Sequence, residues 1–599
     1  MKSFFLKNSF YWFIFLPFWF YALIGSMLYS GYLGDDAYNS QIQGDVLLQG
    51  ITIWERYINE ISGWLKGTGR FYPLAWLNYF WYYYVDNLIL TKLTNFLLIY
   101  FGVLTLALTL NKLKRNELFI KLVALSVPIM MQFTIFMDPI TAFTFLLPSL
   151  FLFFVLSLLF LALYLESGKS RFIILSFIFY LLSILTYEVA YVFWIIHGLI
   201  IYSFEKDYKN TLIKGAPIFF LGLSSIASYF IMQWYYIEKN YDLNHIQGTY
   251  PIFSIHIDSF GIVFHAFLKQ IFGILPFLNS SKSLIHNGVD IFIKVPLHAY
   301  LIFFICIGYI YKLFFSTHLH INKKLNSRVY LNNPSFYNVS LGMFFIFLSA
   351  APVALSGHQQ KIIERTLGNT YLTEYIQYFG VAIIVASILY YIITLDESRK
   401  FIHILKRVLF LFFVFAAALT MGSNNNIVNL SNSLSKNPRN VLENSIKMGI
   451  LEEIEKDDVI IRKYRYPHDN QTNYSKLTKT NLNICRLDKA LYQCLSNYFS
   501  KISLEHNVNL SNSKELSKRN IFYLDYKGNI QKKNSGSIFI DRILELNFNN
   551  DKELINMVPY STKITIYNET LKQKNSFEHK KLYYYSLKDD FNKNDSDFK

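Results

Sequence analysis

The chain has 599 residues, of which 53% are hydrophobic and 18% aromatic, and its formal net charge is +16. This composition argues against an ordinary soluble protein and is typical of integral membrane proteins. Much of the positive charge lies in short loops between apolar runs, where lysine and arginine set the orientation of membrane spans. We therefore do not expect nucleic acid as a partner.

Apolar runs of about 17–25 residues, the length that a bilayer core requires, recur through residues 1–421. The first of them lacks a small-residue cleavage site, so we interpret it as a retained span. Lys2 and Lys7 place the N-terminus on the cytoplasmic side. Length and Lys/Arg bias then predict about eleven spans and an exported C-terminus. The predicted spans are 10–30, 88–110, 118–137, 141–164, 172–186, 189–204, 214–237, 295–314, 337–356, 376–395 and 402–421.

Two further apolar segments are not counted as spans. Arg70–Tyr84 is rich in tryptophan and tyrosine and contains Pro73, which favours an interfacial or re-entrant helix. Phe260–Leu278 contains His265, Lys269 and Pro276, and we expect it only to dip into the outer leaflet. Counting either segment as a span would place a basic loop outside, against the usual bias.

The composition changes from about residue 425, where asparagine, serine and lysine replace the apolar runs. Residues 422–599 are predicted to form a small soluble extracytoplasmic α/β domain with a disordered end at 589–599. A helix is expected over 439–456, with β-rich runs at 459–461, 521–526, 537–540, 564–567 and 582–585. Cys485 and Cys494 could form a disulfide if this region is exported, but their spacing does not decide it.

The most informative motif is the acidic pair Asp35-Asp36, which follows the first span in a long predicted outer loop, residues 31–87. Ionised groups near a membrane are costly unless they are paired or in use. The pair has two interpretations. It could cap a loop or a helix, or it could act chemically, as a general base toward a hydroxyl or as a ligand of a divalent metal ion.

Other charged residues are predicted at the same outer end of the bundle. Glu188 lies between two apolar runs with few residues to spare, so it needs a partner or a cavity. Arg70 could contact a phosphate or anchor a helix in the lipid headgroups. Asp138, which precedes Pro139, is more simply a turn residue. His197 and Gln233 lie within predicted spans and are interpreted as hydrogen-bonding residues of the bundle.

A cationic segment precedes the span predicted at 376–395. His358, Lys361 and Arg365 recur at spacings of three and four, so one helical face would carry them beside Glu364. Such a face could hold a phosphate, with arginine giving two parallel hydrogen bonds. The alternative is a solvated face or contact with headgroups. No set of cysteines and histidines resembles a zinc site.

Gly34-Asp35-Asp36 in the first outer loop, the amphipathic stretch after it, the many spans and the exported tail resemble the GT-C class of integral membrane glycosyltransferases. The likeness covers the layout of residues 1–421. It implies a mainly α-helical, polytopic bundle and an inverting transfer from a polyprenyl-phosphate-linked sugar, in which the acidic pair is catalytic.

Within that class the chain is most similar to bacterial envelope enzymes of the inner membrane, including glucosyltransferases that decorate the O-antigen of lipopolysaccharide. The acceptor would be an envelope glycan or a glycolipid. The resemblance implies catalytic roles for Asp35, Asp36 and, more loosely, Glu188. Arg70, His358, Lys361 and Arg365 would bind the donor phosphate. No WWDYG-type signature is present, so transfer to protein is not expected.

Two other functions remain open from the sequence. A flippase or polymerase of lipid-linked glycans would also be polytopic, but it should carry more charge within its spans. A non-catalytic envelope assembly protein would depend on its tail and not on Asp35-Asp36.

Overall fold

The structure is a computed structural model. It describes the residues in the following ranges: 2–40, 42–85, 87–134, 138–238, 257–273, 284–285, 287–315, 334–355, 371–395, 400–434, 459–462, 521–524, 537–540, 547–548, 554–556, 562–568, 573–579 and 582–585. The chain divides into two compact units, each of which is described by itself. The first unit comprises Met1–Ser30, Tyr57–Trp81 and Asn87–Asn429, and the second comprises Gly31–Arg56, Tyr82–Asp86 and Leu430–Lys599.

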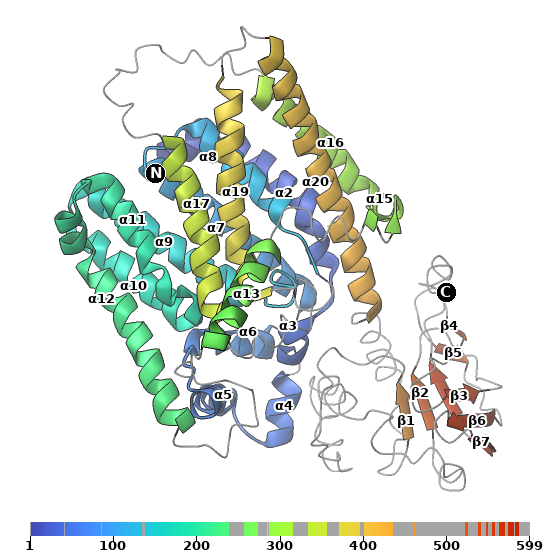
Figure 1. The fold of residues 1–599 in the computed structure, drawn as a ribbon. Helices are drawn as coiled ribbons and strands as arrows, with labels where there is room; N and C mark the ends of the chain where they lie inside the picture. Colours follow the sequence, from blue (N-terminus) through green and yellow to red (C-terminus); the bar gives the residue numbers. More distant parts are fainter. Residues whose placement is uncertain are drawn as a thin grey trace. The chain divides into compact units, whose positions relative to one another are not determined.

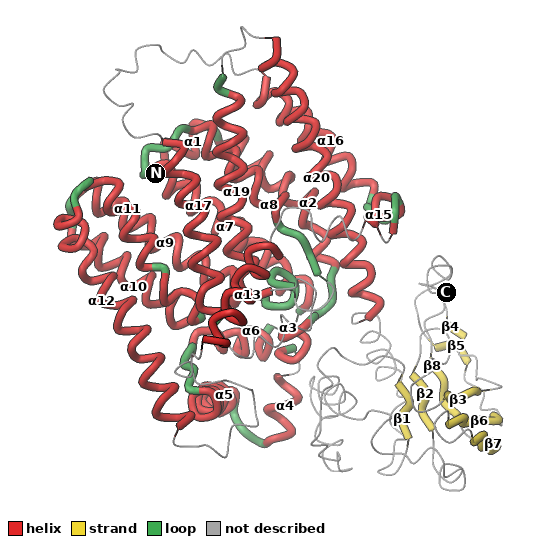
Figure 2. The backbone as a smooth tube through the Cα atoms, viewed as in Figure 1, coloured by secondary structure: helices red, strands yellow, loops and turns green. Residues whose placement is uncertain are grey.

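The described residues up to Leu434 are mainly helical, as predicted (Figures 1 and 2). In chain order the helices are α1 (Lys2–Lys7), η1 (Tyr11–Phe15), α2 (Leu16–Ile24), η2 (Gly25–Tyr29), α3 (Gly34–Asn39), α4 (Ile42–Gln49), α5 (Ile53–Thr68), η3 (Pro73–Leu77), α6 (Asn78–Tyr84), α7 (Leu88–Lys112), α8 (Glu117–Met130), α9 (Leu146–Ser167), α10 (Ser170–Thr186), η4 (Glu188–Val192), α11 (Trp194–Glu205), α12 (Tyr208–Gln233), η5 (Trp234–Glu238), α13 (Ile257–Gly273), α15 (Asp290–Ile293), α16 (Leu297–Phe315), α17 (Pro334–Ala354), α19 (Tyr371–Ile393) and α20 (Lys400–Leu434).

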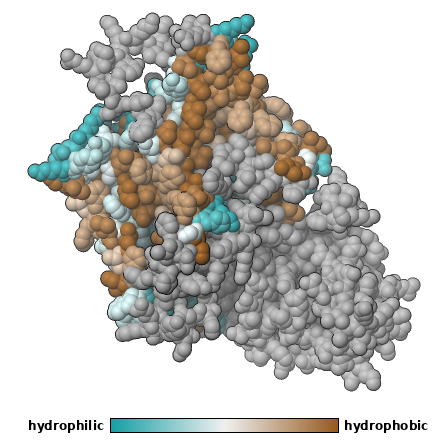
Figure 3. Space-filling model, viewed as in Figure 1, coloured by the Kyte–Doolittle hydropathy of each residue, from teal (hydrophilic) through white to brown (hydrophobic). Residues whose placement is uncertain are grey.

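Nine helices among the described residues are long and apolar enough to cross a membrane, so the chain has the character of a multi-pass membrane protein. Apolar side chains accordingly cover much of the visible helical surface (Figure 3). The candidate spans are Tyr11–Tyr29, Leu88–Lys112, Leu146–Ser167, Glu188–Glu205, Tyr208–Tyr236, Leu297–Phe315, Tyr337–Ala354, Thr373–Ile393 and Lys400–Asn432.

This number is smaller than the predicted eleven, because the helices at two predicted spans are shorter than each of the nine candidate spans, which have 18 residues or more. Residues 172–186 belong to α10, which has 17 residues. The span predicted at 118–137 corresponds to α8, but that helix has only 14 residues and ends at Met130. α20 differs in the other direction, since it continues to Leu434, past residue 421 where the last span was expected to end.

α8 ends at Met130, and side chains of other helices then hold the described residues of the link to α9, 131–134 and 138–145, in a non-helical form. Lys92 and Asn95 of α7 donate to carbonyl oxygens of the link, at 2.6 and 2.7 Å. Asn424 of α20 accepts from the N–H of Phe133 at 2.9 Å and donates to the carbonyl of Met131. Irregular backbone is tolerated inside a membrane protein when its polar groups are satisfied in this way.

Eight short strands follow α20 among the described residues, and no helix is described beyond Leu434. β1, β2 and β8 pair in parallel, β3, β6 and β7 pair antiparallel, and β4 pairs with β5. The predicted α/β domain is therefore not supported. The expected helix at 439–456, the two cysteines and the end of the chain lie outside the described residues. The strands are β1 (Val459–Arg462), β2 (Ile521–Leu524), β3 (Ser537–Ile540), β4 (Asn547–Phe548), β5 (Leu554–Asn556), β6 (Thr562–Asn568), β7 (Gln573–His579) and β8 (Leu582–Tyr585).

Candidate functional site

Glu188 lies at the tip of a helical hairpin in the first unit. α10 ends just before Tyr187, whose extended backbone (φ −164°, ψ 142°) reverses the chain, and Glu188 then begins η4. The hydroxyl of Tyr180, on α10, donates to the carbonyl of Ala190 at 3.1 Å and accepts from the N–H of Trp194 at 3.0 Å. These bonds hold the turn in one conformation, which fixes the position of Glu188.

Arg70 is brought to the hairpin by a short strap, which we define as residues 68–70. The hydroxyl of Thr68 donates to the carbonyl of Trp64 at 2.6 Å and closes the last turn of α5. Gly69 then adopts a positive φ of 65°, which a glycine accepts without strain. The side-chain amide of Gln233, at the end of α12, donates to the carbonyl of Thr68 and holds the strap in place.

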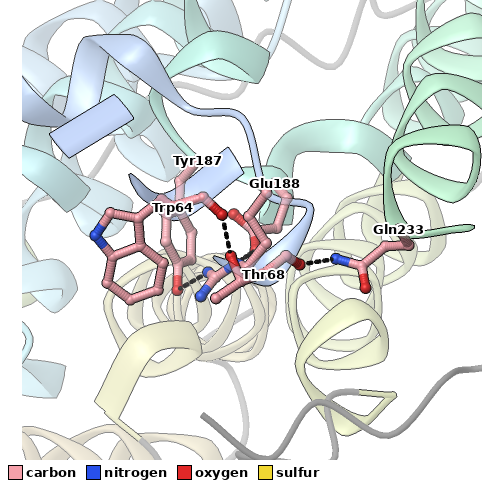
Figure 4. Close-up of polar contacts among 6 residues, drawn as sticks. Trp64, Thr68, Tyr187, Glu188 and Gln233 are labelled. Carbon is pink, nitrogen blue, oxygen red and sulfur yellow. Dashed lines mark hydrogen bonds and ion pairs between the residues drawn. The ribbon is translucent and has the colours of Figure 1, made fainter. Parts of the chain in front are cut away.

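Arg70 and Glu188 form an ion pair at this point. Figure 4 shows Glu188 with Trp64, Thr68, Tyr187 and Gln233 around it. Nε of Arg70 donates to Oε1 of Glu188, and Nη2 donates to the hydroxyl of Tyr187 at 3.1 Å. The guanidinium carbon also lies 5.4, 4.9 and 5.5 Å from the ring centres of Trp64, Tyr72 and Tyr187. Burial opposes the charge on Arg70, but Glu188 and the tyrosines outweigh it and hold the arginine pKa well above its usual range.

The ion pair leaves one nitrogen of the guanidinium and one oxygen of the carboxylate without a hydrogen bond among the described residues. Nη1 of Arg70 has no acceptor there, and the enclosed Oε2 of Glu188 has no donor. The two side chains are 19% and 16% exposed. A buried carboxylate oxygen without a partner is unusual, because desolvation of a charged acceptor is normally offset by hydrogen bonds.

Aromatic rings continue from Arg70 along η3. Trp64 stacks on Trp76 with ring centres 5.9 Å apart, and Tyr72 lies 5.8 Å from each of these two rings. Tyr79 extends the series beyond Trp76 at 5.4 Å. A cation, a carboxylate and aromatic faces together suit a ligand that carries a phosphate, hydroxyl groups and apolar C–H faces.

The acidic pair lies in the second unit. Gly34 opens α3 with a positive φ of 52°, and Asp36 donates its N–H to the carbonyl of Leu33 at 3.0 Å. The Asp36 side chain is buried, whereas Asp35 keeps exposed surface. Desolvation by the surrounding chain and then the charge of Asp36 raise the pKa of Asp35 to about 7. Water that reaches Asp35 screens part of both effects.

Asp138 has the structural role that the sequence indicated. Its carboxylate accepts hydrogen bonds from the backbone N–H groups of Thr134, Ile140 and Thr141 at 2.6–2.8 Å. Burial raises the Asp138 pKa to about 6, although the three backbone donors act in the opposite direction. His197 is likewise a bundle residue, since its Nε2 lies 2.8 Å from the hydroxyl of Ser157.

Of the residues predicted from the sequence, the structure therefore brings Arg70 and Glu188 together and keeps Asp35 beside Asp36. His358, Lys361, Glu364 and Arg365 lie outside the described residues. Sequence reasoning missed the contributions of Trp64 and Tyr187 and the contact of Gln233 with the strap. Tyr187 adjoins Glu188 in the chain, which was the one available signal.

Within the part of the chain that the structure describes, no group of three or more histidine, cysteine, aspartate or glutamate residues is arranged to hold a metal ion. A divalent metal at Asp35 and Asp36 stays a prediction. No protein-family model matches the chain, and no curated protein matches its sequence.

Proposed function

We propose that the chain is a membrane glycosyltransferase, which moves a sugar from a polyprenyl-phosphate donor to a glycan or glycolipid acceptor of the bacterial envelope. The observation that supports this most is the Arg70–Glu188 pair, with its unused donor and acceptor, among the rings of Trp64, Tyr72 and Tyr187. A donor of this class offers a phosphate for the cation and hydroxyl groups for the carboxylate.

In the proposed reaction, Asp35 or Asp36 accepts the proton of an acceptor hydroxyl as its oxygen attacks the anomeric carbon. The bond from that carbon to the phosphate oxygen breaks, the configuration inverts and the lipid phosphate leaves with its negative charge. Cations stabilise that charge as it develops. Arg70 is one such cation, and His358, Lys361 and Arg365 are proposed as the others. Glu188 would bind a hydroxyl of the donor or acceptor.

The finer architecture belongs to the same proposal. It comprises a GT-C-like bundle of about eleven spans, an N-terminus in the cytoplasm and a small α/β domain outside the inner membrane. α8 and α10 would then supply the two spans that fall short in length. A shorter helix can still cross where the bilayer thins or neighbouring helices cover its ends.

The test is mass spectrometry of envelope glycans from cells that lack the gene, complemented with wild type or with Asp35→Asn/Asp36→Asn. The double variant must first be shown in the membrane at the wild-type level. Loss of one sugar residue in both the deletion strain and the variant strain is the expected result, and it would identify the transferred unit. Full restoration by the variant would exclude the catalytic assignment and favour a flippase, a polymerase or an assembly protein.

A further inference from the structure

We propose that Arg70 binds a lipid-borne phosphate by exchanging Glu188 for it, so that the Arg70–Glu188 ion pair and a bound phosphate exclude each other. The inference rests on the proposed function and specifies how the donor phosphate would be held. Glu188 thereby becomes the intramolecular competitor of the ligand.

Arg70 is held in place by contacts other than the one with Glu188. Three aromatic rings lie within 5.5 Å of its guanidinium carbon, and the hydroxyl of Tyr187 accepts from Nη2. Gln233 holds the strap from which the side chain projects. Arginine also keeps its charge throughout the accessible pH range. The cation is therefore preorganised by contacts that an exchange of anions does not break.

Glu188 has fewer contacts that hold its carboxylate in place than Arg70 has for its guanidinium. Its Oε1 accepts from Arg70, and its Oε2 has no donor among the described residues. A phosphate offers more acceptor oxygens than a carboxylate and can take two parallel N–H bonds from one guanidinium. A phosphate that approaches Arg70 also repels the carboxylate. Glu188 would then move aside and could accept a hydroxyl of the ligand.

The position of the ion pair along the chain indicates where the phosphate comes from. Glu188 is the first residue of the candidate span Glu188–Glu205, so the pair stands where an apolar helix begins. That boundary corresponds to the level of lipid phosphates in a bilayer. Trp64 and Trp76 stack beside it, as aromatic residues do at membrane interfaces. A phosphate on a lipid is therefore a better match than a soluble anion.

The experiment measures lipid binding to the full-length protein in nanodiscs by native mass spectrometry. The probes are polyprenyl monophosphate, the corresponding polyprenol and phosphatidylglycerol. Glu188→Gln is the test variant, because it removes the charge and keeps the shape. Glu205→Gln is the control, since Glu205 pairs with Lys214 at 2.8 Å and is 18% exposed, close to the 16% of Glu188.

We expect Glu188→Gln to bind polyprenyl monophosphate about tenfold more tightly than wild type, which corresponds to about 1.4 kcal/mol. Glu205→Gln should match wild type, and Arg70→Ala should bind the phosphate lipid at least tenfold more weakly. Polyprenol binding should be the same in all variants. If Arg70→Ala does not fold, the comparison of Glu188→Gln with Glu205→Gln is enough to test whether Glu188 competes with the phosphate.

Equal or weaker binding of polyprenyl monophosphate by Glu188→Gln would overturn the exchange and leave the proposed function standing. If neither wild type nor Glu188→Gln binds this lipid above polyprenol, the proposed function fails with it. An equal gain for phosphatidylglycerol and polyprenyl monophosphate would support the exchange but contradict a site for the sugar donor.

Discussion

Gly69 lies so close to Gln233 that a Cβ atom on the glycine would stand 2.9 Å from the Cα of the glutamine and 3.1 Å from its backbone nitrogen. Real Cβ atoms do not approach backbone this closely, and Gly69 also needs its positive φ. The contact joins the end of α5 to the end of α12. It thereby sets the position of the strap that carries Arg70.

Gly69→Ala should destabilise the protein and weaken the Arg70–Glu188 pair. An alanine in the left-handed region costs about 1–2 kcal/mol, and the clash with Gln233 adds to this cost. Thermal unfolding in detergent should show a lower midpoint, and transfer measured on envelope glycans should fall more than the amount of protein does. Gly67→Ala is the matched control, because nothing lies within 4 Å of its added methyl group. Equal midpoints for the two variants would contradict the proposed role of the contact.

If the chain is the proposed glycosyltransferase, the dependence of its transfer rate on pH should follow the ionisation of Asp35. If Asp35 is the general base, it must be ionised, and its pKa is raised to about 7. The rate should therefore increase as the pH rises through about 7. In Asp36→Asn the like charge is gone, so the slower residual transfer should reach its half-maximum at a lower pH. An unchanged midpoint in that variant would argue against Asp35 as the base.

The long apolar helices were predictable because their length and composition alone satisfy the bilayer. The end of α8 was not predictable from the sequence. Asn424, which is 291–293 residues away in the chain, bonds the backbone at Met131 and Phe133. The hydropathy of a local segment does not show that so distant a residue will bond to it. The same limit explains why residues 118–137 were predicted as a complete span.

The candidate site, too, could be predicted from the sequence only in part. The sequence predicted that Arg70 and Glu188 share one end of the bundle, since span counting places both there. It did not predict that they pair, because they are 118 residues apart and their contact depends on how α5, α10 and α12 pack. The sequence left Arg70 either as an anchor in the lipid headgroups or as a phosphate contact, whereas in the structure its Nε donates to the carboxylate of Glu188.

Asp138→Asn should lower stability and alter its dependence on pH. An asparagine offers one acceptor oxygen and an NH₂ group to three backbone donors, and unsatisfied buried donors cost about 1–3 kcal/mol each. The wild-type Asp138 pKa is raised from 3.8 to about 6. Its protonated form is therefore favoured by folding, and this contribution is lost as the pH rises from about 4 through about 6. The midpoint of thermal unfolding, followed between pH 4 and 7, should thus fall less steeply with rising pH in the variant. A wild-type slope retained in Asp138→Asn would assign the effect to another group.

The crossing of α17 and α19 depends on two glycines that face each other. A Cβ on Gly342 would lie 2.6 Å from the carbonyl oxygen of Gly380, and the reverse distance is also 2.6 Å. Small residues allow this close approach of helices in membrane proteins. Gly342→Ala should force the helices apart and cost about 1–3 kcal/mol, which is typical of overpacking. Gly308→Ala on α16 meets nothing within 4 Å, and it should be neutral or stabilising by about 0.5–1 kcal/mol, because alanine favours helix over glycine. Thermal unfolding of both variants in the same detergent checks the prediction. A Gly342→Ala midpoint equal to that of Gly308→Ala would mean that the two helices have room to separate at no cost.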